Sequence, residues 1–264
     1  MKIKYFSQGL NDILEVLKNI DVLFYLSKSD LYARYKSSIL GPLWITFGTF
    51  IFIFGLGFLW SKLFHKNLSE FIPSITIGIL IWQIISTSIV ESTNIFNNKA
   101  SIIKNIKMPL FIFPAQIVIK QLINFCHNII IYILIFFIFN IKLTSSFLFF
   151  IPMFLIFIIN MMWITLMFSI IGARFRDFHF VINALMPLIF FMTPVIYQAN
   201  DLGYFSKIIK INPLTHFIET IRAPLMGDEI SLMSTAFCFG FAVIGWILTL
   251  SFFNKTRNNI VFWI

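Results

Sequence analysis

Long apolar stretches without a charged residue alternate with short charged segments along the whole chain. The longest stretch, residues 143–173, runs for 31 residues without Asp, Glu, Lys or Arg. Because a helix needs about 20 mostly apolar residues to cross the hydrocarbon core of a bilayer, each such stretch predicts one crossing. The six expected spans cover about 39–62, 71–90, 109–139, 146–172, 179–198 and 231–253.

The apolar stretches are continuous and do not alternate with polar residues, so they predict helices and not the strands of a membrane barrel. We therefore expect an all-α polytopic membrane protein with a single transmembrane domain over residues 1–264. Composition agrees, because only 12% of the residues are charged whereas soluble domains carry about a quarter. Lipid is thus the expected solvent for most of the chain.

The distribution of basic residues predicts how the spans are oriented. With the N-terminus inside, the cytoplasmic segments contain 13 Lys and Arg residues and the outer segments contain six. Since cytoplasmic loops carry the excess of Lys and Arg, both chain ends are expected in the cytoplasm. The net charge of +9 does not indicate nucleic-acid binding, because the basic residues are dispersed between apolar segments.

Residues 12–36, ahead of the first span, predict an amphipathic helix that lies in the membrane interface. Asp12 is placed to cap its N-terminus. Apolar residues follow at three- and four-residue spacing, namely Ile13, Val16, Leu17, Ile20 and Phe24.

The segment between the fifth and sixth spans, residues 201–229, contains apolar patches that are too short to cross a bilayer. These patches predict re-entrant or surface-lying helices on the outer side. One helix is expected to begin at Pro213 with Asn212 as its cap, because Pro favours the first helical position. Glu219 and Arg222 are expected to pair on its surface.

Two stripes of side chains within the spans are candidates for lining a conduit. An aromatic stripe in the first span comprises Trp44, Phe47, Phe50, Phe54 and Phe58, for which lipid contact or core packing is the alternative. A polar stripe in the third span comprises Gln116, Lys120, Asn124 and His127. Polar groups are costly in a membrane and usually face the protein interior or a water-filled cavity. Alternatively, Lys120 could extend to the lipid headgroups.

Two charged segments fall on the expected cytoplasmic side. Residues 91–108 predict a short helix that either rests on headgroups or docks into a cytoplasmic partner. The segment GARFRDFHF, residues 172–180, is expected to form a turn between two spans. Its Arg174 and Arg176 either anchor the topology or contact a partner, and Asp177 is expected to pair with one of them.

The sequence lacks the motifs of several function classes. It has no G-x-x-x-x-G-K-[ST] loop for nucleotide phosphates, no H-E-x-x-H, and no carboxylate pair suited to glycosyl chemistry. We therefore expect no catalytic, cofactor or metal site in this chain. No acidic residue falls in the core of a span, so a transport function would take its energy from another subunit.

Three blocks of the sequence together resemble a known family. They are RYKSSILGPLWITFGTF (34–50), GARFRDFHFVINALMPLIFFMTPVIY (172–197) and INPLTHFIETIRAPLMG (211–227). They resemble the ABC-2 type permease subunit of polysaccharide exporters, which serve O-antigen, capsule and teichoic-acid export. The resemblance implies a permease of the bacterial cytoplasmic membrane that dimerises, pairs with two ATP-binding cassette subunits holding ATP and Mg, and moves a lipid-linked glycan.

The resemblance also implies roles for the two cytoplasmic segments and for the aromatic stripe. Short coupling helices of the family dock into the ATP-binding subunits, and the matching positions here are Asn94, Phe96, Lys99, Ile103, Arg174, Arg176 and Asp177. Aromatic residues line the family's conduit. The alternatives are an ABC-2 permease for a drug or lipid, a membrane-embedded glycan-modifying enzyme, and a structural partner without transport.

Overall fold

The computed structural model describes residues 2–264 except 37, 40, 42, 64, 143, 200–202, 204 and 205. It describes the side chains of all of these but 2–7, 34 and 35. Within this part of the chain the regular structure is helical and contains no strand. Residues 37, 40 and 42 of the first block that resembles the ABC-2 permeases lie outside the described residues.

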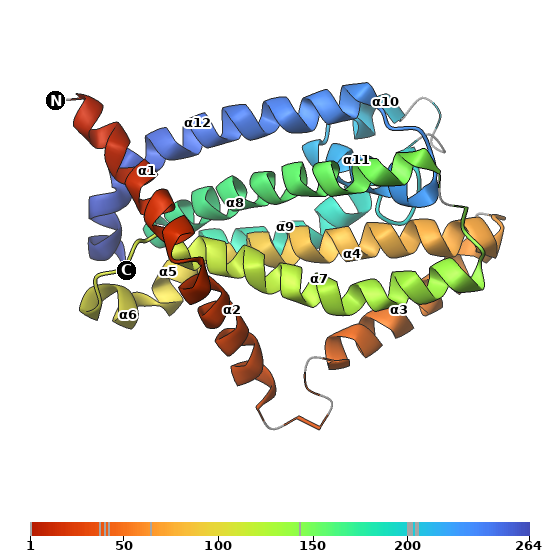
Figure 1. Cartoon of the computed structure of the whole chain (residues 1–264), viewed down its shortest axis with the longest axis horizontal. Helices are drawn as coiled ribbons and strands as arrows, with labels where there is room; N and C mark the ends of the chain where they lie inside the picture. Colours follow the sequence, from red (N-terminus) through yellow and green to blue (C-terminus); the bar gives the residue numbers. More distant parts are fainter. Residues whose placement is uncertain are drawn as a thin grey trace.

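Five helices are long and apolar enough to cross a membrane, and they run side by side (Figure 1). They are α3 (Leu43–Leu63), α4 (Leu68–Ser92), α7 (Ile112–Ile138), η1–α8 (Ser145–Arg174) and α12 (Leu232–Trp263). The fourth of these joins a 3-10 turn, η1 (Ser145–Phe149), to α8 (Phe150–Arg174). A helix satisfies all its backbone groups internally, which is why an unbroken apolar run adopts this form in lipid.

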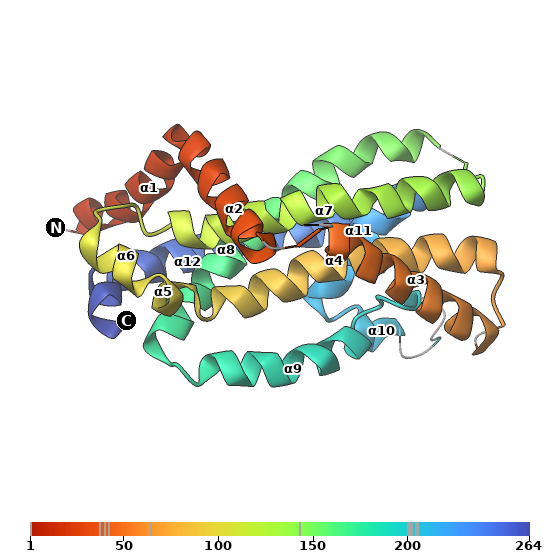
Figure 2. The ribbon, with the colours of Figure 1, turned by 90° about the horizontal axis from the view of Figure 1, so that it is seen from below.

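The fifth expected span differs from the other five. Where the sequence predicts a crossing over 179–198, the structure has α9 (Phe178–Met192), which is only 15 residues long. Pro194 follows shortly, and its missing N–H and fixed φ do not suit a helix interior. The described residues thus form five long apolar helices, with α9 as a shorter apolar helix along the outside of the bundle beside α4 (Figure 2).

Helix α4 lies at the centre of the bundle and α3 at its edge. Most side chains of α4 are buried, because it packs against α3, α7, α8, α9 and α11. By contrast, α3 buries only one narrow stripe, formed by Thr49, Ile53, Gly57 and Ser61. The apolar residues on its other sides are exposed in this single chain.

The N-terminal region is two helices and not the single helix expected over 12–36. These are α1 (Lys2–Lys18) and α2 (Ile20–Tyr35), which meet at Asn19 and diverge (Figure 2). Helix α1 packs on α12, and α2 packs on α7. Leu17, Ile20 and Phe24, which were expected on the apolar face, are exposed. Helix α2 instead buries Leu23, Ser27 and Leu31.

The segment after α9 folds back into the bundle through α10 (Ser206–Ile209) and α11 (Pro213–Met226). As expected, Asn212 caps α11 by accepting a hydrogen bond from the Leu214 N–H at 3.0 Å. Arg222 is buried and does not lie on a helix surface. Its guanidinium donates to the carbonyl oxygens of Pro194 and Val195, each at 2.8 Å, and so ties the chain after α9 to α11.

One end of the bundle collects the short helices α5 (Ile95–Asn98) and α6 (Ala100–Asn105) together with both ends of the chain (Figure 1). The start of α9 also lies here, whereas α10 lies toward the opposite end. We call these the α5–α6 end and the α10 end.

Candidate functional site

The two segments expected to be cytoplasmic pack directly on each other at the α5–α6 end. Asn97 of α5 donates to the carbonyl oxygen of Gly172 at 3.4 Å. The hydroxyl of Thr93 lies 2.8 Å from Nδ1 of His179. A Cβ atom on Gly172 would collide with the carbonyl oxygen of Thr93, so only glycine permits this approach of α8 to the end of α4. We call these four residues the basal junction.

The seven residues matched to coupling helices differ in exposure. Arg174, Arg176 and Asp177 are exposed, whereas Asn94, Lys99 and Ile103 are half-buried. Phe96 is buried at 1% exposure and contacts the ring of Phe113, so it anchors α5 to the core. A partner can therefore reach the three charged residues directly but not the Phe96 side chain.

The charged residues of the α8–α9 turn do not pair with one another. Arg174 lies over the Trp263 ring, 5.4 Å from its centroid, at the end of α12. Within the described residues Asp177 forms no ion pair with Arg174 or Arg176, which differs from the expectation. Asp177 occupies the N-cap position of α9, where its side chain makes no capping bond.

Two ion pairs line a cleft of about 390 Å³, which His179 of the basal junction also lines. Lys99, between α5 and α6, contacts Asp30 of α2 at 2.9 Å. Lys120 of α7 pairs with Glu91 at the end of α4, and the Lys120 side chain is only 10% exposed. These pairs tie α2 and α7 to the segment from the end of α4 to Lys99. We call this the charged cleft.

Asp12 is a structural residue whose role differs from the expected one. It lies inside α1 and is buried, and so it does not cap a helix start of its own. Its carboxylate accepts hydrogen bonds from the Leu110 N–H at 2.7 Å and from Arg257 Nε at 3.1 Å. Asp12 thus joins α1, the chain entering α7, and α12. Its partner Arg257 is 245 residues away, so no local pattern could have revealed it.

The aromatic stripe lies on the open side of α3. Trp44, Phe47, Phe50 and Phe58 are exposed, and Phe54 is partly buried against the core. A Cβ atom added at Gly48 or Gly55 of the same helix would meet no described neighbour within 4 Å, so the surface of α3 is also open at these glycines. In a membrane this face contacts lipid, a partner chain or a transported molecule.

The polar stripe of α7 divides into separate environments. Gln116 is buried and donates to the Leu26 carbonyl oxygen of α2 at 3.2 Å, one turn before the Lys120 pair. Asn124 is half-buried and lines a partly open cavity. His127 is half-buried, and its Nδ1 lies 2.8 Å from the Ile123 carbonyl oxygen of its own helix.

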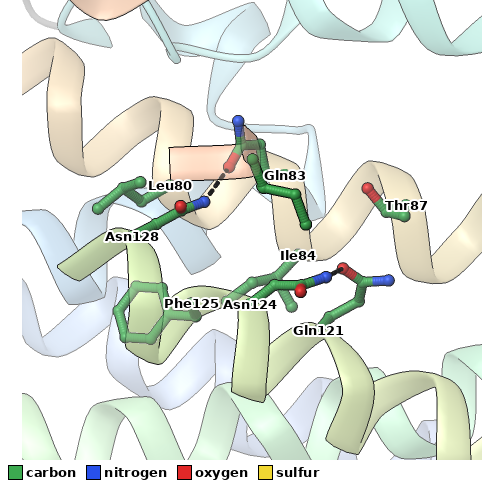
Figure 3. Close-up of a pocket in the computed structure, with 9 residues that line it drawn as sticks. Leu80, Gln83, Ile84, Thr87, Gln121, Asn124, Phe125 and Asn128 are labelled. Carbon is green, nitrogen blue, oxygen red and sulfur yellow. Dashed lines mark hydrogen bonds between the residues drawn. The ribbon is translucent and has the colours of Figure 1, made fainter. Parts of the chain in front are cut away.

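The cavity at Asn124 lies between α3, α4 and α7 and has a volume of about 210 Å³ (Figure 3). Its apolar walls are Ile45, Leu80, Ile84 and Phe125. Five uncharged polar side chains complete the lining, and we call it the amide cavity after them: Gln83, Thr87, Gln121, Asn124 and Asn128.

Part of this lining is a continuous hydrogen-bond chain that holds α3. Asn128 accepts from Thr46 Oγ1 at 2.9 Å and donates to Gln83 Oε1 at 3.0 Å. Gln83 in turn donates to Thr49 Oγ1 at 2.9 Å. Hydrogen bonds of this kind between membrane helices are worth about 0.6 kcal/mol on average, so α3 is attached here by modest forces.

Of the five polar lining residues, only Asn124 was expected from the sequence. On α7 the lining follows Gln121, Asn124 and Asn128, a stripe adjacent to the predicted one and also at helical spacing. Gln83 and Thr87 lie one turn apart on α4, a signal that was available in the sequence. Among the described residues, no group of three His, Cys, Asp or Glu is placed to hold a metal ion.

The sequence was compared with protein families and with curated proteins. A family model described as "ABC-2 type transporter" matches residues 21–226. Two proteins of Klebsiella pneumoniae, each named O-antigen export system permease protein RfbA, are 26% and 28% identical to this chain; in both cases the similarity covers 90% of this chain and 92% of the relative. A protein of the same name from Myxococcus xanthus is 23% identical over 80% of this chain and 82% of its own length.

The matched region runs from the start of α2 to the end of α11 and covers most of the chain. It therefore includes the basal junction, the charged cleft and the amide cavity. This chain belongs to the ABC-2 type transporter family.

Proposed function

We propose that this chain is the membrane permease subunit of an ATP-driven exporter that moves a lipid-linked polysaccharide across the bacterial cytoplasmic membrane. Family membership and the names of the relatives, similar along nearly their whole length, support this function. In this proposal the permease is a homodimer, and ATP hydrolysis takes place on two separate ATP-binding cassette subunits. Permease and ATPase then exchange force through a surface at the α5–α6 end.

The basal junction is the single observation that best supports such coupling. It joins the α4–α5 turn to the α8–α9 turn through the Asn97–Gly172 hydrogen bond and the Thr93–His179 contact. Arg174, Arg176 and Asp177 are exposed on the joined α8–α9 turn. A push on this surface therefore reaches α4, at the centre of the bundle, and α8 and α9 together.

The membrane topology of the proposal has six crossings with both chain ends in the cytoplasm. Helix α9 and the chain up to 198 form the fifth crossing, and α10 and α11 form a re-entrant segment at the outer face. The location of both chain ends at the α5–α6 end supports this arrangement. So does the excess of basic residues in the segments assigned to the cytoplasm.

The open face of α3 is the proposed boundary of the conduit. Its exposed aromatic rings offer flat apolar surfaces on which the C–H faces of sugar rings can slide without a fixed register. A conduit between two copies of the chain would place these rings around the polymer and remove them from lipid.

Deletion of the chain tests the proposal in cells that make the glycan. We expect lipid-linked polysaccharide to accumulate on the cytoplasmic side and to disappear from the cell surface, with recovery when the wild-type chain is restored. Accumulation of a drug or of an unglycosylated lipid instead would assign the permease to another cargo. A change in the structure of the glycan, with normal export, would indicate a glycan-modifying enzyme.

Gentle purification tests the partnership independently. The permease should be recovered with an ATP-binding subunit in equal amounts. Purification without any ATPase, from membranes that still export the glycan, would contradict the proposal.

A further inference from the structure

The amide cavity contains one hydrogen-bond donor and one acceptor that nothing in the described chain satisfies. Asn124 Nδ2 donates to Gln121 Oε1 at 3.0 Å, which leaves Gln121 Nε2 and Asn124 Oδ1 without partners (Figure 3). Gln121 is only 5% exposed. If both amides were turned over, the free donor and the free acceptor would exchange places but both would remain. In either assignment an unpaired donor lies beside an unpaired acceptor; both atoms are buried within residues that line the cavity, so a guest reaches them only when the surrounding side chains move aside.

This pattern selects the chemistry of a guest. A buried polar group without a partner is unfavourable, so the cavity gains most from a guest that accepts from one amide and donates to the other. A hydroxyl group does both. No charged side chain is among the described residues that line the cavity, and the nearby Lys120 and Glu91 pair with each other in the charged cleft. The lining thus suits a neutral polyol and not a phosphate or a carboxylate.

Size and walls restrict the guest further. The volume of about 210 Å³ is below the roughly 300–1,000 Å³ of pockets for drug-sized ligands, so it suits one ring and not a segment of polymer. Phe125 provides an aromatic wall, and Ile84 and Leu80 provide aliphatic ones. Aromatic and aliphatic walls beside convergent amides match the two sides of a pyranose, with its C–H faces and its hydroxyl rim.

The cavity lies behind the face proposed to line the conduit. On the α3 side the cavity is lined by Ile45, which follows Trp44 of the aromatic stripe in the sequence. Because α3 is held here by two side-chain hydrogen bonds, one donated by Thr46 and one accepted by Thr49, a small displacement of α3 would open the cavity further toward a molecule on that face. A ring can then leave the aromatic surface and enter between α3 and α7.

We propose that the amide cavity is a neutral-sugar subsite, in which Gln121 and Asn124 bind adjacent hydroxyls of one pyranose ring of the exported glycan. This inference rests on the proposed function for its cargo, but it assigns a site within a single chain. In cells, loss of this subsite should leave export of the glycan in place but change which glycans the permease prefers.

The decisive variant is the double substitution Gln121→Leu with Asn124→Leu. Replacing both amides, which bond to each other and leave one atom of each without a partner, by apolar groups of similar shape removes this unfavourable burial, so thermal stability without sugar should be unchanged or raised. Binding of methyl α-mannopyranoside and methyl β-glucopyranoside should weaken at least about tenfold, the loss expected for two ordinary hydrogen bonds. Saturation-transfer NMR on the complete transporter, in nanodiscs free of sugar detergents, measures this binding.

Cys126→Leu is the matched control, because it introduces the same side chain on the same helix at an exposed position away from the cavity. It should leave both stability and sugar binding as in the wild type. Methyl glucuronide, which has a similar ring and one negative charge, should bind the wild type at least about tenfold more weakly than the neutral glycosides, because no basic side chain is among the described lining residues.

Three results would overturn the inference. Equal sugar binding by the wild type and the double variant would show that the amides do not contact the sugar. A marked loss of stability in the double variant would show that they are structural. Absence of neutral-glycoside binding by the wild type would leave the cavity to water alone. Each result leaves the proposed export function intact if deletion of the chain still traps lipid-linked glycan inside the cell.

Discussion

The charged cleft and the amide cavity are neighbours along α7, and they treat their polar groups in opposite ways. Lys120 ends the first region and pairs with Glu91, so the charge is satisfied by the protein itself. Gln121 and Asn124 begin the second and retain an unpaired donor and acceptor. The first region ties α2, α4, α5 and α7 together near one end of the bundle, whereas the second lies deeper, beside the loosely packed α3.

The difference indicates where the molecule is rigid and where it can accept a guest. A buried charge requires its partner, so the charged cleft fixes the helices that connect to the basal junction. A buried amide atom without a partner costs less free energy than an unpaired buried charge, so the fold can tolerate it in the absence of a ligand. Substitutions in the charged cleft should therefore change the free energy of unfolding most, and substitutions of exposed charged residues should change it least.

Glu91→Gln should have the largest effect. It leaves the Lys120 ammonium, which is 10% exposed, without its carboxylate inside the bundle. Loss of one partner of a buried ion pair costs about 3–5 kcal/mol. We expect a strong fall in the amount of folded permease in membranes and in its thermal stability after purification.

The companion variants isolate the pairing. Glu91→Gln with Lys120→Met removes both charges and should recover most of the loss, because neither partner is left uncompensated. Lys99→Met disrupts the more exposed Lys99–Asp30 pair and should cost no more than about 1 kcal/mol. Equal destabilisation by the single and the double variant would show that pairing does not explain the role of Glu91.

Gly172→Ala should have the next largest effect. Its new Cβ would collide with the carbonyl oxygen of Thr93, so α8 and the end of α4 must move apart. Overpacking of this kind costs about 1–3 kcal/mol. It should also reduce export more than it reduces ATP hydrolysis, because the basal junction joins the two turns.

Gly240→Ala is the matched control on α12, where a Cβ meets no described neighbour within 4 Å. It should be as stable as the wild type within about 0.5 kcal/mol. Thermal unfolding, membrane abundance and the ratio of export to ATP hydrolysis are measured for both variants. A Gly172→Ala protein indistinguishable from Gly240→Ala would contradict the close packing of the junction.

Asn128→Leu should have a smaller effect and sharpens the contrast within the amide cavity. Asn128 is engaged on both sides, since it accepts from Thr46 and donates to Gln83. Its removal should lower the free energy of unfolding by about 1 kcal/mol. The Gln121→Leu and Asn124→Leu pair, in contrast, should not lower it. Thermal unfolding of the three proteins decides this, and a reversed order would refute the distinction between structural and ligand-binding amides.

Arg174→Glu with Arg176→Glu should have the smallest effect on stability, within about 0.5 kcal/mol, because both side chains are exposed. Its effect should be on coupling: the permease stays in the membrane, but ATP hydrolysis no longer drives export. Arg174→Lys with Arg176→Lys keeps the charge and is the control. Normal export by the Glu variant, with its topology verified, would reduce the two arginines to topological anchors.

The sequence was sufficient for the helical character and for the family. Unbroken apolar runs account for the five long helices, since a run of that length has few alternatives in lipid. The helix over 179–198 was harder to predict, because this segment has the composition of a span but α9 ends at Met192, before Pro194. Composition therefore did not predict where the helix in that segment ends.

The site could be predicted only in part. Lys120 and Asn124 were singled out because polar residues in a span are unusual, and both line pockets in the structure. The partner of Lys120 could not be inferred, because Glu91 comes from another helix whose register is set by packing, whereas Asn124 bonds to Gln121 on its own helix. Asp12 shows the same limit: a local pattern suggested a cap, whereas its partner Arg257 is near the other end of the chain.

Transport in inverted membrane vesicles tests the central claim most directly. Vesicles that contain the permease, its ATP-binding partner and radiolabelled lipid-linked glycan on the outer surface are supplied with ATP. We predict that the glycan becomes protected from an added glycosidase, and that protection requires both ATP and this chain. Protection that is equal without the chain, or ATP hydrolysis without any protection of the glycan, would contradict the account.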